Sequence, residues 1–132
     1  MKFLLTLILT ACVSFAFGQK MYNAVTTELY KKDYSTGKYE LVDKNKNTNI
    51  TIVSEGYTLT IQALSPTMYK LSEYGSKEID NQYFYGHTYK ARDLKNNLNC
   101  DIDIVQHRTS KYLIISVWFD DYNFRYMIEP KE

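Results

Sequence analysis

The chain has 132 residues, and its 16 basic and 15 acidic side chains give a formal net charge of +1 at neutral pH. This balance excludes the strongly basic surface of a nucleic-acid-binding protein and a polybasic membrane patch. The length suits a single domain that buries its own hydrophobic core.

The N-terminal residues predict a secretory signal peptide. Lys2 gives a positively charged start, and the apolar run over residues 3–17 is too short to span a bilayer comfortably. Small residues at Ala16 and Gly18 form a cleavage site. We therefore expect residues 1–18 to be removed and residues 19–132 to form one secreted or periplasmic domain.

A lipid anchor is the alternative for the same segment. The sequence LTAC that ends at Cys12 resembles a bacterial lipobox, in which the cysteine carries lipid and becomes the new N-terminus. Residues 13–17 stay apolar where a lipoprotein normally turns polar, so cleavage after Gly18 is the favoured prediction. No second apolar run approaches membrane-spanning length, which predicts no membrane span.

The rest of the chain has the composition and the patterning of β-strands. It is rich in Tyr, Ile, Val, Thr and Phe, and short alternating runs are separated by clusters of Gly, Asn, Asp and Ser. No long window has the three-and-four spacing of an amphipathic helix. Short loops predict antiparallel hairpins between neighbouring strands. The predicted strands are 22–31, 38–44, 49–54, 57–63, 68–74, 83–92, 99–106, 111–119 and 122–129.

Two hairpins have a predicted register. A turn at Glu55-Gly56 places Ile52 opposite Leu59 and gives one apolar and one mostly polar face. A turn at Asp120-Asp121 pairs the last two strands, and a loop over residues 107–110 adds the preceding strand. The predicted buried face of these three strands consists of Cys100, Ile102, Ile104, Leu113, Ile115, Val117, Phe124 and Tyr126.

The opposite face of these strands carries the first candidate binding patch. Trp118, the only tryptophan, shares this face with Tyr112 and Arg125. The predicted register aligns Asp101 with Ser116 and Arg125. Aromatic rings beside polar groups suit a wet binding surface, whereas packing under a loop or a terminal strand is the alternative.

A row of aromatic residues forms the second candidate patch. Tyr83, Tyr85, His87 and Tyr89 alternate along one predicted strand and therefore point to one face. Rings in a row can form a platform for a sugar or a flat apolar ligand. Ordinary sheet packing of strand tyrosines is the alternative interpretation.

Catalytic and metal-binding motifs are missing from the sequence, and no cofactor is predicted. There is no nucleophile elbow, HExxH, Gly-rich phosphate loop or CxxC, and His87 and His107 lie on separate predicted strands. Asp101 and Asp103 share a face and could do acid–base chemistry on glycosides. An ion pair of Asp101 with Arg125 and a solvated Asp103 is the favoured interpretation.

Two further residues have a conservative interpretation. Cys100 has no partner once Cys12 leaves, so we expect a buried, unreactive thiol. Asn49 begins a formal glycosylation sequon, which matters only in a eukaryotic host.

The C-terminal stretch supports a resemblance to known proteins. The sequences NCDIDI and YLIISVWFDDYNFRY, which span residues 99–126 with a short gap, resemble the C-terminal part of small secreted proteins of unknown function from Gram-negative bacteria. The size and strand number are similar to those of calycin-type barrels such as lipocalins and avidins. The chain lacks an N-terminal GxW motif and a lipocalin disulfide, and a shared architecture implies no function.

These observations predict an all-β fold, an antiparallel meander of eight or nine short strands. A small β-barrel is preferred over a two-sheet sandwich because closure removes exposed edges. We expect an exported, non-enzymatic binding domain that engages a carbohydrate, a small ligand or a partner protein through aromatic side chains. A structural subunit of a surface assembly or an inhibitor is the alternative, and the oligomeric state is left open.

Overall fold

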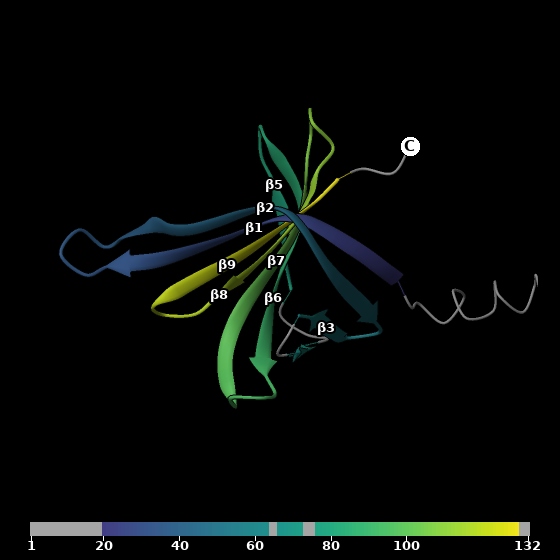
Figure 1. The fold of residues 1–132 in the computed structure, drawn as a ribbon, viewed down its shortest axis with the longest axis horizontal. Helices are drawn as coiled ribbons and strands as arrows, with labels where there is room; N and C mark the ends of the chain where they lie inside the picture. Colours follow the sequence, from purple (N-terminus) through teal and green to yellow (C-terminus); the bar gives the residue numbers. More distant parts are fainter. Residues whose placement is uncertain (1–19, 64–65, 73–75, 130–132) are drawn as a thin grey trace, which may run out of the picture.

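The computed structural model describes residues 20–63, 66–72 and 76–129, which contain nine strands and no helix (Figure 1). The predicted signal peptide and Cys12 lie outside these residues. The strands are β1 (Lys20–Asp33), β2 (Lys38–Glu55), β3 (Thr58–Gln62), β4 (Thr67–Leu71), β5 (Lys77–Asp80), β6 (Phe84–Asp93), β7 (Leu98–His107), β8 (Leu113–Trp118) and β9 (Tyr122–Ile128).

Eight of the strands close into an antiparallel barrel. The sheet order is β4-β3-β2-β1-β9-β8-β7-β6, and pairing of β4 with β6 closes the circuit. The predicted meander is therefore confirmed, and the barrel, not the sandwich, is the architecture. The closing contact is short and includes Leu71 opposite Ala91.

Strand β5 continues along the edge of β6 that β4 leaves free. Lys77 of β5 pairs with Thr88, and the Ser72 backbone N–H donates to the Lys90 carbonyl at 2.8 Å between the two pairings. The sequence Lys77–Asp80 is short and mostly exposed, so it lacks the alternating apolar pattern by which a strand is predicted. β5, the start of β6 and the end of β7 pair with one another and extend together beyond the barrel (Figure 1).

The β2–β3 turn lies one residue later than predicted, which shifts the strand pairing by two residues. The turn residues are Gly56-Tyr57, so Ile52 lies opposite Ile61 instead of Leu59. Gly56 has a φ of +59°, which the first central position of a two-residue type II′ turn requires. The buried face is unchanged because a shift of two residues preserves the alternation.

The β7–β8 register is also shifted by two residues, so Asp103, and not Asp101, lies opposite Ser116. The turn begins one residue later than predicted, after His107, whose backbone N–H donates to the Tyr112 carbonyl at 2.9 Å. The His107 imidazole Nδ1 accepts the backbone N–H groups of Thr109 at 3.3 Å and Ser110 at 3.2 Å within this turn. The predicted β8–β9 register is confirmed, with Val117 opposite Phe124 and Ile115 opposite Tyr126.

The two predicted strands 38–44 and 49–54 form one strand, β2. Its pairing with β1 shifts register between Ala24 and Thr26 and again between Leu29 and Tyr30. Such irregularities break the alternation of side chains, which is why the sequence pattern divides the strand. The β1–β2 hairpin extends well beyond the barrel (Figure 1).

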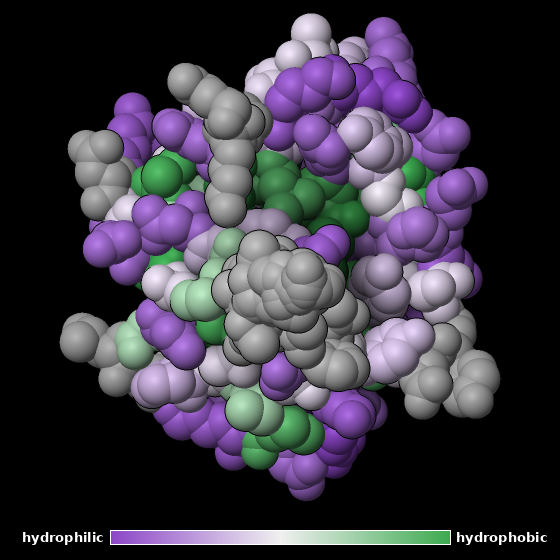
Figure 2. Space-filling view, turned by 90° about the vertical axis from the view of Figure 1, so that its right-hand side faces the viewer, coloured by the Kyte–Doolittle hydropathy of each residue, from purple (hydrophilic) through white to green (hydrophobic). Residues whose placement is uncertain are grey.

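The centre of the barrel is filled with apolar side chains. Six of them have 0–1% exposure, and the predicted core face belongs to the same cluster, either buried or packed against it. Cys100 is 6% exposed, as expected. On the side shown in Figure 2, hydrophobic residues gather in a hollow that hydrophilic residues surround. The six core residues with 0–1% exposure are Ala24, Ile52, Leu59, Ile102, Ile115 and Val117.

Candidate binding site at the barrel mouth

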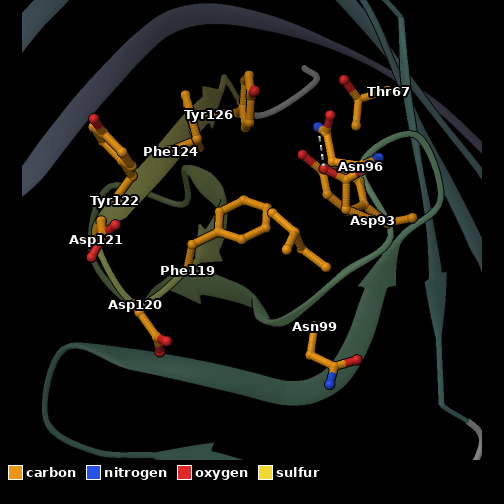
Figure 3. Close-up of a pocket in the computed structure, with 12 residues that line it drawn as sticks. Thr67, Asp93, Asn96, Asn99, Phe119, Asp120, Asp121, Tyr122, Phe124 and Tyr126 are labelled. Carbon is orange, nitrogen blue, oxygen red and sulfur yellow. Dashed lines mark hydrogen bonds between the residues drawn. The ribbon is translucent and has the colours of Figure 1, made fainter.

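A cavity of about 460 Å³ opens at the end of the barrel where the β6–β7 and β8–β9 turns meet (Figure 3). We call it the barrel mouth. The filled core forms its floor, and the start of β4 contributes to its side. It is lined by Thr67, Tyr69, Asp93, Asn96, Leu98, Asn99, Phe119, Asp120, Asp121, Tyr122, Phe124 and Tyr126.

One wall of the barrel mouth is aromatic. Alternation along β9 directs Tyr122, Phe124 and Tyr126 to the interior side, and Phe119 projects into the middle of the cavity (Figure 3). The Phe119 and Phe124 rings meet edge to face with centroids 6.2 Å apart, and Tyr122 stacks on Phe124 at 6.4 Å. Tyr122 is 38% exposed and forms the accessible part of this wall.

The facing wall is polar and is organised by Asp93, which is 2% exposed. The carboxylate accepts the backbone N–H of Lys95 at 2.9 Å and that of Asn96 at 3.1 Å, and it accepts the Asn96 side-chain amide at 3.0 Å. This Asx turn satisfies the buried charge and fixes the β6–β7 turn. Asn96 consequently has a defined position along the cavity, and Asn99 is held separately, because its Oδ1 accepts from the Arg92 guanidinium at 2.7 Å (Figure 3).

Two phenol groups supply hydrogen-bonding capacity between these walls. Burial raises the pKa of Tyr126 to about 12, and burial together with the nearby Tyr126, Asp93 and Cys100 raises the pKa of Tyr69. Both hydroxyls therefore stay protonated at neutral pH and can donate. Neither makes a hydrogen bond to another residue in the described part of the chain.

The charge of the barrel mouth has one sign. Asp93, Asp120 and Asp121 line it, and no Lys, Arg or His is among its described lining residues. Asp120 and Asp121 are exposed at the rim. The cavity therefore disfavours an anion and suits a neutral or cationic ligand.

The predicted row of Tyr83, Tyr85, His87 and Tyr89 does not form one continuous platform. Tyr89 packs against the core, whereas Tyr85 and His87 line a separate cavity of about 480 Å³ between β5, β6 and β7. The Tyr85 hydroxyl donates to the Gln106 Oε1 at 2.6 Å, and the Arg108 guanidinium lies 5.0 Å from its ring centroid. Tyr83 is 56% exposed.

The predicted patch of Trp118, Tyr112 and Arg125 is brought together only in part. Trp118 and Arg125 line one groove of about 270 Å³ on the outer face of the barrel. Tyr112 precedes β8 and Trp118 ends it, so the length of that strand separates them. The Arg125 guanidinium lies 5.0 Å from the Tyr30 ring centroid.

The expected ion pair of Asp101 with Arg125 is wrong. Asp101 pairs with Lys90 at 3.1 Å, whereas Arg125 lies 4.0 Å from Glu28. The expected solvation of Asp103 is also incomplete, because its carboxylate accepts the Trp118 indole N–H at 3.0 Å. The two-residue shift between β7 and β8 accounts for both differences.

Sequence reasoning missed the barrel mouth because its aromatic residues read as core. Phe124 and Tyr126 lie on the predicted buried face, and Asp93 reads as an ordinary turn residue. The sequence does carry one signal that could indicate a cavity here: Tyr, instead of Leu or Ile, stands at inward-facing positions near a turn. Such a side chain brings a hydroxyl to the edge of the core.

A comparison with known proteins finds no matching protein-family model, no matching curated protein and no matching solved structure. Within residues 20–63, 66–72 and 76–129, no group of three or more His, Cys, Asp or Glu side chains could hold a metal ion. The same residues contain no helix long and apolar enough to cross a membrane.

Proposed function

We propose that this chain is an exported, non-enzymatic domain that binds a neutral carbohydrate in the barrel mouth. The observation that carries the proposal is the pairing of an accessible aromatic wall with polar groups across a cavity of about 460 Å³. Small-ligand sites commonly have this size and this combination of apolar walls with a few placed polar groups. The proposed export rests on residues 1–18, which have the pattern of a secretory signal peptide.

The lining matches the two-sided chemistry of a sugar ring. The C–H face of a sugar ring can pack on Tyr122 and Phe119, since aromatic faces present a large apolar area. Sugar hydroxyls can donate to the carboxylates of the rim and accept from the phenols of Tyr69 and Tyr126. The carboxylates disfavour acidic sugars.

Non-covalent binding fits the role of the carboxylates better than catalysis does. Asp93 is fully engaged in its turn through three hydrogen bonds. Asp120 and Asp121 are neighbours in one tight turn and do not face each other across the cavity (Figure 3). Glycosidic hydrolysis uses two carboxyl groups that flank the bond.

Saturation-transfer NMR with glucose, galactose and N-acetylglucosamine tests the proposal, with glucuronic acid as the anionic comparison. We expect at least one neutral sugar to bind and glucuronic acid to bind more weakly. Tyr122→Ala should abolish binding, and Tyr126→Phe should weaken it. Tyr34→Ala is the matched control, because Tyr34 is 70% exposed and lies in the β1–β2 turn. Absence of binding to all three neutral sugars, or binding that Tyr122→Ala leaves unchanged, would overturn the proposal.

A further inference from the structure

A second cavity of about 460 Å³ adjoins the barrel mouth and shares two residues with it. Asn99 and Asp120 line both cavities, so the two hollows meet at these side chains. We call the second cavity the outer groove. It is lined by Lys90, Ala91, Asn99, Cys100, Asp101, Trp118 and Asp120.

Trp118, the last residue of β8, and Phe119, which follows it, present one aromatic ring to each cavity. Trp118 and Phe119 are consecutive, and alternation in an extended chain sends their side chains to opposite faces. Phe119 accordingly lines the barrel mouth and Trp118 the outer groove. A ligand that crosses the rim meets an aromatic ring on each side of it.

The Trp118 ring is held in place before any ligand arrives. Its indole N–H donates to Asp103 at 3.0 Å, and the Tyr39 ring meets it edge to face at 5.2 Å. The Tyr39 hydroxyl in turn donates to the backbone carbonyls of Phe119 and Asp120, each at 3.1 Å. One contact set thus fixes both the ring and the rim, which lowers the entropic cost of binding.

The outer groove offers hydrogen-bonding groups with little net charge. Lys90 and Asp101 form an exposed ion pair at 3.1 Å, with side-chain exposures of 71% and 48%. A sugar hydroxyl can accept from the ammonium and donate to the carboxylate. Asp120 adds a negative charge at the junction, so an acidic chain is disfavoured here as well.

We propose that the barrel mouth and the outer groove form one track for a neutral oligosaccharide, with one ring in the mouth and the next rings over Trp118. This inference rests on the proposed function and specifies its ligand as a chain. A single ring cannot contact both Tyr122 and Trp118, because they lie in different cavities on either side of the rim.

The fluorescence of the only tryptophan provides a direct test. Glucose and the cello-oligosaccharides up to the tetramer, together with the matching N-acetylglucosamine series, are titrated while Trp118 emission and saturation-transfer NMR are recorded. We expect the monomer that binds by NMR to leave the emission unchanged. The trimer should change the emission and bind roughly tenfold more tightly, which corresponds to about 1.4 kcal/mol of additional binding free energy.

A double variant separates the two cavities. Lys90→Ala with Asp101→Ala should reduce the affinity for the trimer to near that for the monomer and leave monomer binding unchanged. Asp80→Ala with Arg108→Ala removes another exposed ion pair, remote from the track, and should change neither affinity. Monomer binding without any gain in affinity or change in emission for longer chains would overturn the track and retain the proposed function. Failure of every sugar of any length to bind would overturn both.

Discussion

The Trp118 indole N–H donates to the Asp103 carboxylate at 3.0 Å, diagonally across strands β8 and β7. The direct Cα partner of Trp118 is Asp101, whose carboxylate instead pairs with Lys90. Two aspartates two residues apart therefore have different roles. Asp103 orients the tryptophan ring, whereas Asp101 belongs to an exposed ion pair.

This difference predicts unequal effects of alanine substitution on stability. Asp103→Ala leaves the half-buried indole N–H without its partner and should lower the free energy of unfolding by about 1–2 kcal/mol. Asp101→Ala removes only an exposed ion pair and should cost less than about 1 kcal/mol. Urea denaturation of the two variants measures both values. A larger loss for Asp101→Ala would contradict the assigned roles.

Alkaline pH should destabilise the fold through its buried acidic groups. Burial, with lesser contributions from Asp93 and Asp101, raises the pKa of the Cys100 thiol from 9.0 to about 11, and burial raises the pKa of Tyr126 from 10.0 to about 12. At a pH between the ordinary pKa and the raised pKa of either group, that group has lost its proton in the unfolded chain but keeps it in the folded chain. The free energy of unfolding must then fall as pH rises from about 9 toward 12.

Substitution of each group by a side chain that cannot ionise tests whether Cys100 and Tyr126 cause this loss of stability. Cys100→Ala should make the decline shallower between about pH 9 and 11, and Tyr126→Phe between about pH 10 and 12, because each removes one titration. Urea denaturation at a series of pH values gives the slopes. Tyr34→Phe, at an exposed tyrosine, is the control and should keep the wild-type slope. Slopes unchanged in both test variants would rule out this explanation.

The backbone at Gly86 leaves no room for a side chain. A Cβ atom there would lie 2.1 Å from the Ile104 carbonyl oxygen and 2.7 Å from the Val105 Cα. Gly86→Ala should therefore force β6 and β7 apart and cost about 2–3 kcal/mol. Gly37→Ala is the comparison, since a Cβ there meets no atom within 4 Å and only the left-handed backbone cost of about 1 kcal/mol remains. Equal losses in thermal denaturation would show that the strands can separate freely.

The charge of the rim should control discrimination between neutral and acidic sugars. Asp120→Asn with Asp121→Asn removes two negative charges and should raise the affinity for glucuronic acid relative to glucose by roughly three- to tenfold at low salt. The gain should shrink as salt is added. Glu78→Gln with Asp80→Asn removes two charges at the cavity near Tyr85 and should leave the ratio unchanged. A ratio that follows the control variant would exclude selection by the rim.

The sequence predicts the faces of the strands better than their partners. The β8–β9 register follows from a two-residue turn and a uniformly apolar face, and the structure confirms it. At Gly56 and after His107, two registers that differ by two residues bury the same side chains. Alternation cannot distinguish them, and the turn conformation decides.

Features that depend on distant parts of the chain are not visible in the local pattern. Closure of the barrel rests on a short pairing of β4 with β6, and β5 is too short and too polar to stand out. The barrel mouth combines the β6–β7 and β8–β9 turns, which the β7–β8 hairpin separates along the chain. In the local sequence pattern, the aromatic residues of its wall therefore look like ordinary core residues. Two pairs of predicted site residues do share a hollow: Trp118 with Arg125 on the outer face of the barrel, and Tyr85 with His87 between β5, β6 and β7.

Amide shift mapping with a neutral monosaccharide tests the central claim most directly. ¹⁵N-labelled protein is titrated with glucose, galactose or N-acetylglucosamine, and the shifts are placed on the structure. We predict that they cluster at Asn96, Asn99 and residues 119–126, around the barrel mouth. Shifts confined to residues 78–87 at the opposite cavity, or no shifts with any of the three sugars, would contradict the account.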